Sequence, residues 1–355
     1  MKALILSGGT GTRLRPLTHT GAKQLMPIAN KPVLYYALET LRDAGIQEVG
    51  IVVGHTHKEI RSAVEDGQRW GLHVTYIVQD APRGLADAVR IAETFIGHEP
   101  FLVYLGDNLI REPLREVVLQ FASMGSNALI LLSSVPRPEQ FGVAELVDGQ
   151  VVRLIEKPTV TDSNLALVGV YVFDHTIFEA VKSIGLSWRR EYEITDAIQY
   201  LVDHQYRVSA HVLTGWWKDT GTPHDVVEAN RLILDSLESS ITGFVDADSS
   251  LSGSVVLEPG AQVIRSVVRG PAIIGRHAVI RDAYVGPFTA LGNAVQIIGS
   301  EIENSVVLAG TRIENVPVRI DGSLIGQDVL LLYNRDYRPH AWSFVLGDHS
   351  RADFR

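Results

Sequence analysis

The chain has 355 residues, of which 46% are hydrophobic and 21% charged, so it is long enough for two globular domains. Its formal net charge of −9 argues against a general nucleic-acid binder, and the lack of cysteine excludes disulfides, thiolate metal sites and cysteine nucleophiles. Apolar stretches are too short for a membrane span or a signal-peptide core. We therefore expect a cytoplasmic protein with no nucleic-acid or membrane partner.

Short apolar runs alternate with helical patterns over residues 1–240. This alternation predicts an α/β domain with a Rossmann-like, mostly parallel open sheet and crossover helices. Ligands of such sheets lie at the carboxyl ends of the strands. A helix after Thr222 closes this predicted domain. The predicted strands cover residues 2–6, 49–53, 74–78, 101–105, 128–132 and 167–173, and the predicted helices cover residues 32–42, 85–95, 195–203 and 223–235.

The pattern changes over residues 241–355, where aliphatic residues recur at intervals of six and glycine often follows them. Such a period is typical of a β-helix, in which each short strand forms one side of a coil. The register slips between Ile280 and Val285, which predicts an irregular coil. A plain β-sandwich is the alternative interpretation. We expect the aromatic segment at residues 331–346 to pack against the rest, and the coil faces to support a homo-oligomer.

A glycine-rich loop follows the first predicted strand, within the sequence LILSGGTGTRLRPLT at residues 4–18. It lacks the Lys-Ser/Thr pair of a P-loop, and Leu14 occupies the third glycine position of a dinucleotide-binding loop. A tight strand-to-helix turn without a ligand is the remaining structural interpretation. Arg13 and Lys23 favour an anion, because backbone amides, a guanidinium fork and an ammonium group together suit a triphosphate.

The loop and a series of later motifs resemble one family of enzymes. The sequence LSGGTGTRLRPLT, followed by KQLMPIANKP, is similar to the signature of sugar-1-phosphate nucleotidyltransferases. Within this family the chain is most similar to the long glucose-1-phosphate thymidylyltransferases, which end in a left-handed β-helix. The resemblance continues through VQDAPRGLADA, LGDN, FGVAEL, IEKP, ALVGVYVFD, EITDA and WKDTGT, and so covers roughly the first 220 residues.

The resemblance implies that glucose 1-phosphate attacks the α-phosphorus of dTTP with Mg²⁺, giving dTDP-glucose and pyrophosphate. The attacking phosphate oxygen is already anionic, so the protein needs no general base and must instead position and neutralise two polyanions. Long forms are familiar from actinomycete pathways to unusual sugars, which implies a role in secondary metabolism such as antibiotic biosynthesis.

The resemblance also assigns roles to individual residues. It implies that Asp107 and Asp219 bind the metal, because carboxylate oxygens suit Mg²⁺. Catalytic roles are implied for Arg13, Lys23 and Lys157. The nucleotide would contact Leu6, Gly8, Gly9, Gly11, Thr12, Gln24, Gln79, Pro82, Gly84, Leu85 and Asp107, with Gln79 and Gly84 reading the base. The sugar phosphate would contact Asn108, Gly142, Glu156, Lys157, Leu167, Tyr171 and Glu193.

Several alternatives remain open from the sequence. UTP is a competing substrate, because one methyl group distinguishes its base from that of dTTP and contributes only about 1–3 kcal/mol. Arg190 and Tyr192 replace the family's glycine and leucine, either altering sugar tolerance or changing only the surface. An acyltransferase acting through the coil, with His277 as a candidate residue, is a second class. A catalytically inactive homologue is a third.

Overall fold

The computed structural model describes residues 1–333; residues 334–355, which hold most of the aromatic segment expected to pack, lie outside the described part. The chain forms two compact units. The first comprises residues 1–11, 21–25 and 33–219, and the second comprises residues 12–20, 26–32 and the chain from Thr220 onward. Two short N-terminal segments thus belong to the second unit. The domain boundary predicted at residue 240 stays a prediction.

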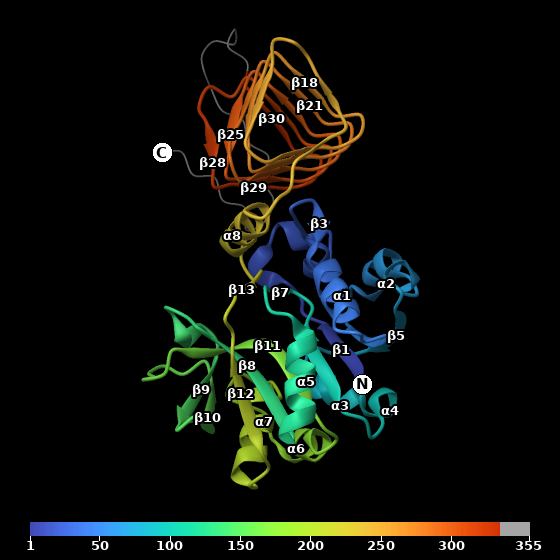
Figure 1. Ribbon diagram of the computed structural model, residues 1–355, viewed down its shortest axis with the longest axis vertical. Helices are drawn as coiled ribbons and strands as arrows, with labels where there is room; N and C mark the ends of the chain where they lie inside the picture. The colour runs from blue at the N-terminus through green and yellow to red at the C-terminus, as the bar shows by residue number, and fades with distance from the viewer. Residues whose placement is uncertain (334–355) are drawn as a thin grey trace. The chain divides into compact units, whose positions relative to one another are not determined.

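A mostly parallel sheet forms the centre of the first unit (Figure 1). Its strands are β1 (Lys2–Ser7), β4 (Glu48–Val53), β5 (His73–Val78), β6 (Phe101–Leu105), β8 (Ala128–Ser134), β9 (Gly142–Val147), β10 (Gln150–Glu156), β11 (Leu165–Phe173) and β12 (Val208–Val212). The main path runs β10-β9-β11-β6-β1-β4-β5, and β8 joins β11 to β12. β1 is parallel to β4 and β6, whereas β11 is antiparallel to β6, β8 and β9. Each of the six predicted strands lies within one of these strands.

Helices connect the strands of this sheet. They are α1 (Val33–Asp43), α2 (His57–Val64), α3 (Leu85–Ile91), α4 (Glu93–Ile96), α5 (Leu114–Met124), α6 (Ile177–Ser183) and α7 (Ile194–Asp203), with short 3-10 turns η3 (Lys23–Leu25), η4 (Gln68–Trp70) and η5 (Pro138–Gln140). The single helix predicted over residues 85–95 is broken at Ala92 into α3 and α4. A two-stranded ribbon completes the unit, with β7 (Asn108–Ile110) antiparallel to β13 (Trp217–Asp219).

The sheet is buried on both faces, which explains why its strands read as continuous apolar runs. Alternate residues of β1 enter two different cores. Leu4 and Leu6 pack in a cluster that includes residues of α3, α6 and α7. Ala3 and Ile5 pack in a second cluster with residues of α1, α2 and α5. The predicted class, an open α/β sheet with crossover helices, is confirmed.

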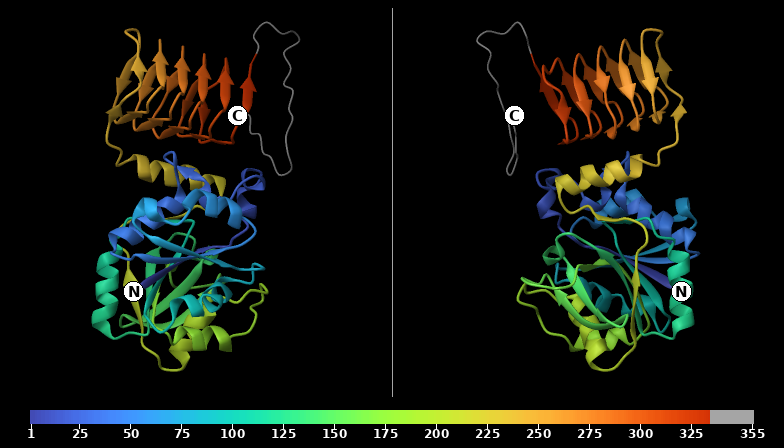
Figure 2. Two further views of the ribbon diagram at one scale, coloured as in Figure 1. Left: turned by 90° about the vertical axis from the view of Figure 1, so that its right-hand side faces the viewer. Right: turned by 60° about the vertical axis from the view of Figure 1, so that its left-hand side comes forward.

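Three parallel sheets of short strands form the coil of the second unit, and Figure 2 shows these strands stacked side by side. Val255 pairs with Ala272 and Ala272 with Thr289, so one coil repeats after 17 residues. This confirms the predicted β-helix. The strands are β14 (Ser240–Ile241), β15 (Phe244–Val245), β16 (Ser250–Ser252), β17 (Val255–Leu257), β18 (Gln262–Ile264), β19 (Val267–Arg269), β20 (Ala272–Ile274), β21 (Val279–Arg281), β22 (Tyr284–Val285), β23 (Thr289–Leu291), β24 (Gln296–Ile298), β25 (Glu301–Glu303), β26 (Val306–Val307), β27 (Arg312–Glu314), β28 (Ile320–Asp321), β29 (Leu324–Ile325) and β30 (Leu330–Leu332).

The corners of the coil explain the slip in its sequence period. His277, Asp282 and Phe288 have φ of 58°, 49° and 59°, so the chain turns through the left-handed region at each corner. The side from His277 to Asp282 spans five residues and the next side, to Phe288, spans six. Ile280 lies on the shorter side and Val285 on the longer one, and both point into the core, so their spacing is five instead of six. The His277 ring lies where a side chain on Gly260 of the preceding coil would stand. This is a packing position, and it gives the acyltransferase alternative no support.

The remaining elements of the second unit are α8 (Pro223–Leu234), the turns η1 (Thr12–Leu14) and η2 (Leu17–His19), and the short strands β2 (Pro27–Ile28) and β3 (Lys31–Pro32). As predicted, Thr222 caps α8, and it forms a reciprocal capping box with Asp225. The helix packs on the coil, with Leu234 against Ile273 and Ala290. By contacts α8 therefore groups with the coil, whereas the sequence pattern placed it at the end of the first domain.

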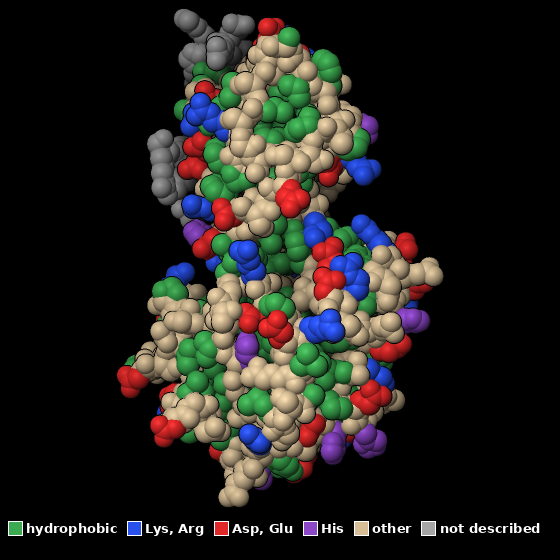
Figure 3. Space-filling view, in the orientation of Figure 1, with side chains coloured by type: hydrophobic (Ala, Val, Ile, Leu, Met, Phe, Trp, Pro, Cys, Tyr) green, Lys and Arg blue, Asp and Glu red, His purple; other side chains and the backbone are tan. Residues whose placement is uncertain are grey.

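Surface charge and helix length agree with the composition. On the face shown in Figure 3, acidic and basic side chains are interspersed and form no continuous basic surface. Among the residues that the structure describes, none of the helices combines the length and the apolar character that crossing a bilayer requires.

Candidate active site

The glycine loop follows β1 and lies against two of the predicted site residues. A side chain on Gly8 would place its Cβ 2.9 Å from Oε1 of Gln79, and one on Gly9 would place its Cβ 3.4 Å from Cε of Lys23. Gly8 therefore allows an approach that a side chain would prevent, whereas a Cβ on Gly9 would make an ordinary van der Waals contact. The fold thus brings together the loop, Gln79 after β5 and Lys23 in η3.

Lys23 forms an ion pair with Asp107, the carboxylate that follows β6. Asn108 donates a hydrogen bond from its Nδ2 to Oδ1 of Asp107, at 3.1 Å. Both side chains of the ion pair are largely buried, which strengthens their attraction relative to a pair in water. The other predicted metal ligand, Asp219, ends β13 directly opposite Asn108 in the β7–β13 ribbon. The ribbon thus brings Asp219 next to the residue that follows Asp107, 112 positions earlier in the chain.

The segment after β5 is held in place by backbone contacts with Tyr192. The amide of Tyr192 donates to the carbonyl of Arg83, and the amide of Ala86 donates to the carbonyl of Tyr192, at 2.8 and 3.0 Å. Gly84 has φ of 108°, and a side chain there would collide with the Tyr192 backbone. The structure thus provides a packing reason for Gly84. Its proposed contact with the base stays a prediction, as do those of the flanking Pro82 and Leu85.

Gln79 is buried and has two acceptors on one side of its carboxamide. Its Nε2 donates to Oδ2 of Asp87 at 2.9 Å and to the carbonyl of Gly84 at 3.3 Å. The fully buried Asp87 is paired in turn with Arg90, at 2.5 Å. The sequence analysis did not identify Asp87, although it lies within the quoted motif VQDAPRGLADA. The signal was a carboxylate two residues into a helix that starts at the predicted base-binding loop.

The predicted sugar-binding residues gather around the end of β10. Gly142 begins β9 directly opposite Glu156, and a side chain on Gly142 would lie 3.0 Å from Oε2 of Glu156. Oε2 of Glu156 also accepts a hydrogen bond from the hydroxyl of Thr195, at 3.4 Å. Leu167 and Tyr171 come from β11. The pKa of Tyr171 is raised mainly by burial and, to a smaller extent, by the negative charge of Glu156. The sequence motifs FGVAEL, IEKP and ALVGVYVF thus converge in one place.

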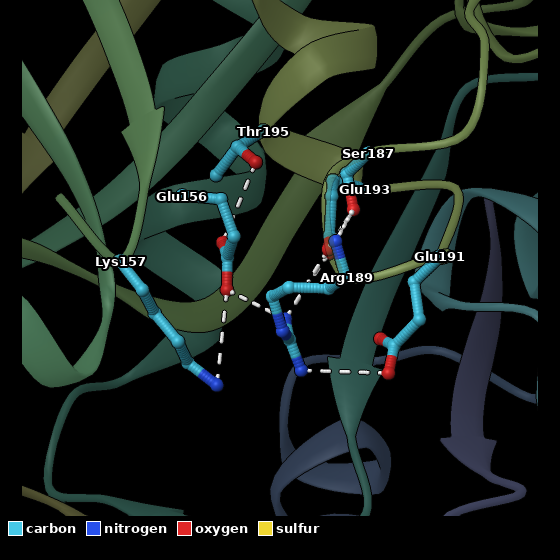
Figure 4. Close-up of polar contacts among 7 residues, drawn as sticks. All are labelled: Glu156, Lys157, Ser187, Arg189, Glu191, Glu193 and Thr195. Carbon is cyan, nitrogen blue, oxygen red and sulfur yellow. Dashed lines mark hydrogen bonds and ion pairs between the residues drawn. The ribbon is translucent and has the colours of Figure 1, made fainter.

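Arg189 occupies the centre of this group and was not among the predicted site residues (Figure 4). Its Nη1 lies 3.2 Å from both Oε1 of Glu156 and Oε1 of Glu193, and its Nη2 lies 3.4 Å from Oε1 of Glu191. Ser187 donates a further hydrogen bond to Glu193 at 2.9 Å. Lys157 lies at the edge of the group, 4.0 Å from Glu156. One guanidinium therefore contacts three carboxylates.

The pKa values of the two buried carboxylates of this group, Glu156 and Glu193, are raised. Burial, followed by the charge of Glu193, raises the pKa of Glu156, while Lys157 and Arg189 act in the opposite direction. Burial is also the main cause that raises the pKa of Glu193, against its hydrogen bond from Ser187. Buried carboxylates clustered in this way are more typical of a binding site than of a stabilising contact.

The structure also places the two departures from the family pattern, Arg190 and Tyr192, and two further predicted residues, Leu6 and Gln24. Arg190 is exposed at a turn with φ of 62°, the conformation that favours the glycine it replaces. Tyr192 packs at the edge of the first core. Leu6 is buried in that core. Gln24 is buried in η3, and Oε1 of Gln24 has no hydrogen-bond partner among residues 1–333.

The assembled site consists of first-unit residues, with Gly11 at φ of 65° where the loop leaves the unit. Thr12 and Arg13 lie in η1, which belongs to the second unit, and their roles stay predictions. The geometry combines glycine amides, a lysine paired with an aspartate, a buried glutamine and a cluster of carboxylates around Arg189. This donor set fits two phosphorylated substrates, one carrying a base and the other a polyhydroxyl group.

Comparison with known proteins agrees with this chemistry. Residues 2–236 match the nucleotidyl transferase family model. The chain belongs to the nucleotidyl transferase family. It is 52% identical to a glucose-1-phosphate thymidylyltransferase of Streptomyces griseus over 99% of both chains, and 50% identical to that of Streptomyces antibioticus over the full length of both. A Bacillus anthracis structure, assigned as a glucose-1-phosphate thymidylyltransferase in complex with sucrose, covers 65% of this nucleotidyltransferase with a TM-score of 0.62 and 36% identity, and is itself covered to 94%.

Proposed function

We propose that this nucleotidyltransferase is a glucose-1-phosphate thymidylyltransferase, which converts dTTP and glucose 1-phosphate into dTDP-glucose and pyrophosphate. The observation that carries the proposal is the end-to-end match to two thymidylyltransferases at half identity or more. The site supports it independently, because the glycine loop lies against Gln79 and Lys23 while a separate group of acidic side chains surrounds Arg189 beside Glu156.

At the phosphate end, a sugar phosphate oxygen forms a bond to the α-phosphorus of dTTP as the bond to the bridging oxygen of the pyrophosphate breaks. The pyrophosphate leaves with the electron pair of that bond. The amides of Gly8 and Gly9, with Lys23 and Arg13, are proposed to hold the triphosphate and stabilise the leaving group. Because the attacking oxygen is already anionic, the chain needs no general base.

The donor set at Asp107 and Asp219 fits a divalent cation, proposed to be Mg²⁺. Asp219 ends β13 opposite Asn108, the residue that follows Asp107, and the ion pair with Lys23 places Asp107 beside a positive charge. A bound cation would neutralise phosphate oxygens during the transfer. With the cation on Asp107, Lys23 would be available to the triphosphate.

At the sugar end, Glu156 is proposed to accept hydrogen bonds from sugar hydroxyls, and Lys157 to contact the sugar phosphate. The left-handed conformation of Lys157, with φ of 44°, turns the chain sharply after β10. Gly142, Leu167 and Tyr171 would form the walls. Arg189 lies between the carboxylates of Glu156 and Glu193, and its charge opposes the rise of their pKa values that burial causes.

A pyrophosphate-release assay tests the proposal. Purified enzyme is supplied with Mg²⁺, one of dTTP, UTP, CTP, ATP and GTP, and one of several sugar 1-phosphates. We expect dTTP with glucose 1-phosphate to have the highest kcat/KM and UTP to follow. Turnover with UTP that equals or exceeds that with dTTP would overturn the thymidylyl assignment. A homo-oligomer, a cytoplasmic location and use of the product in secondary metabolism remain our expectations.

A further inference from the structure

We propose that Asp87 is a positioning residue that fixes the carboxamide of Gln79 so that it offers the nucleotide base a hydrogen-bond acceptor. It would thereby select bases that carry an N–H on the ring edge they present, such as thymine and uracil, over cytosine. This inference rests on the proposed function, because it concerns the nucleotide of that reaction.

A short relay of side chains, from the exposed Arg90 to the buried Asp87 and Gln79, carries the inference. Arg90 on α3 contributes a guanidinium, which only donates hydrogen bonds, to Oδ1 of Asp87 at 2.5 Å. The other oxygen, Oδ2, accepts from Nε2 of Gln79 at 2.9 Å. The carboxylate of Asp87 is fully buried, so no water competes for it. Both oxygens of the Asp87 carboxylate thus accept hydrogen bonds, one from Arg90 and the other from Gln79.

The orientation of the Gln79 carboxamide follows from this relay. Its Nε2 faces two groups that can only accept, the carboxylate of Asp87 and the carbonyl of Gly84. The reversed orientation would place Oε1 against both acceptors and lose two hydrogen bonds. Oε1 is therefore turned toward the glycine loop, where a Cβ on Gly8 would lie 2.9 Å away. Gln79 thus presents an acceptor on the side of the proposed triphosphate loop.

Base chemistry converts this orientation into specificity. Thymine and uracil carry a hydrogen on N3, which can donate to Oε1 of Gln79. Cytosine has no hydrogen on N3, so its ring nitrogen would face Oε1 as a second acceptor. A site built around a hydrogen bond rejects an analogue that lacks the partner far more strongly than an apolar pocket rejects a missing methyl group. Asp87 would therefore set the choice between dTTP and dCTP, while the methyl group distinguishes dTTP from dUTP.

The substitution Asp87→Asn tests the relay. Arg90 holds Oδ1 of the new asparagine, so its amide group faces Gln79 and favours the reversed carboxamide. We expect kcat/KM for dTTP to fall by about tenfold to a hundredfold, since a buried hydrogen bond to the base is lost. The value for dUTP should fall in parallel, because dUTP also carries the N3 hydrogen. The value for dCTP should change less, so that the dTTP:dCTP ratio narrows by at least about tenfold.

Two controls separate positioning from general damage. Asp80→Asn makes the same chemical change on the same loop, where Asp80 is exposed and contacts Arg83 at 2.7 Å, and it should leave the ratio unchanged. In a Gln79→Ala background, Asp87→Asn should cause no further narrowing, because the residue acts through Gln79. Circular dichroism melts show whether each variant is folded.

The outcomes are distinguishable from failure of the proposed function. If the wild-type enzyme releases no pyrophosphate with dTTP and any sugar 1-phosphate, the proposed function is wrong. If the wild type is active and folded Asp87→Asn keeps the wild-type dTTP:dCTP ratio, the inference is wrong. If Asp87→Asn does not fold, the smaller Asp87→Ser provides the same test: its hydroxyl can donate as well as accept, so the ratio must narrow there too. An unchanged ratio in folded Asp87→Ser would equally overturn the inference.

Discussion

The two units of this enzyme bury polar groups in different ways. In the coil, the buried polar side chains are hydroxyls that close on the backbone; those of Ser266, Ser300 and Ser305 donate to carbonyls two residues earlier. In the sheet unit, buried polar side chains meet one another instead. Gln79 meets Asp87, and Glu156 and Glu193 share Arg189.

The difference teaches where function lies. A buried hydroxyl bonded to its own backbone satisfies both groups and costs little, so it needs no functional explanation. A buried carboxylate has a large desolvation cost even when it is paired, and it is retained where the charge is used. Ion pairs in the coil, such as Arg265 with Asp282, stay at the surface. We therefore expect the sheet unit to carry the binding chemistry, and the coil to be stabilised by its apolar interior.

The largest effect expected from this comparison is loss of activity at Asp107. Asp107→Ala should lower kcat/KM for dTTP by about a thousandfold, because the cation and Lys23 both lose their carboxylate partner. Pyrophosphate release measures the effect. As a matched control, Asp282→Ala removes an exposed carboxylate from the coil and should leave the rate unchanged. Wild-type activity in Asp107→Ala would show that Asp107 is not a required metal ligand.

The next effect is on stability and belongs to the coil. Ile297 is fully buried in its interior, and Ile297→Ala should lower the free energy of unfolding of the coil by about 2–5 kcal/mol through the cavity it leaves. Denaturant unfolding measures this change. The exposed Ile241, at one end of the coil, provides the control, since Ile241→Ala removes little buried surface. Equal losses in both variants would contradict the view of an apolar interior as the main support.

A third prediction concerns Glu156 in the cluster of carboxylates around Arg189. Glu156→Gln keeps the size of the side chain but removes the charge that accepts hydrogen bonds from the sugar. We expect KM for glucose 1-phosphate to rise by about tenfold to a hundredfold while KM for dTTP stays nearly constant. Initial rates at varied concentrations of each substrate separate the two values. A rise confined to KM for dTTP would contradict the proposed contact between Glu156 and the sugar.

We also expect the difference in stability between the wild type and Glu156→Gln to depend on pH. Burial raises the pKa of Glu156 in the folded enzyme, whereas an unfolded glutamate ionises near about 4.3. Below that pH both states are protonated, and as the pH rises through the raised pKa the folded wild type loses stability relative to Glu156→Gln. Unfolding titrations at pH 4 and pH 8 measure the difference. The contribution of Asp282 to stability should instead be lost as the pH falls, because its hydrogen bond with Arg265 lowers its pKa in the folded enzyme.

The smallest effect is expected for exposed pairs of the coil. Arg265 and Asp282 form a bidentate contact with 2.7 Å hydrogen bonds, but both side chains are about half exposed. Arg265→Ala should leave the thermal midpoint within the scatter of replicate melts, because solvent and salt screen such pairs. A clear drop in the midpoint would show that surface charge ladders support the coil as much as its interior does.

Much of the fold was predictable because its signals are local. Six strands, most helices, the cap at Thr222 and the coil follow from apolar periods and capping residues within short windows. The slip between Ile280 and Val285 even predicted an irregular coil, which the five-residue side explains. The break at Ala92 was missed, since the helical pattern continues across it.

The site was predictable in its motifs but not in its pairings. Arg189 lies 33 positions from Glu156, and no sequence window shows that they meet. Asp87 lies eight positions from Gln79, but a loop and a helix start intervene, so helical spacing could not connect them. Similarly, only the β7–β13 ribbon places Asp219 beside Asn108.

The sequence by itself determined the class of elements and the class of chemistry. Apolar periods set strands, helices and coil, while the glycine loop with Lys23 indicated a phosphate substrate, because these properties depend on neighbouring residues alone. Only the tertiary structure decided which charges are buried together and which way the Gln79 carboxamide points. Desolvation and hydrogen-bond polarity depend on every group within a few ångströms, and those groups come from distant parts of the chain.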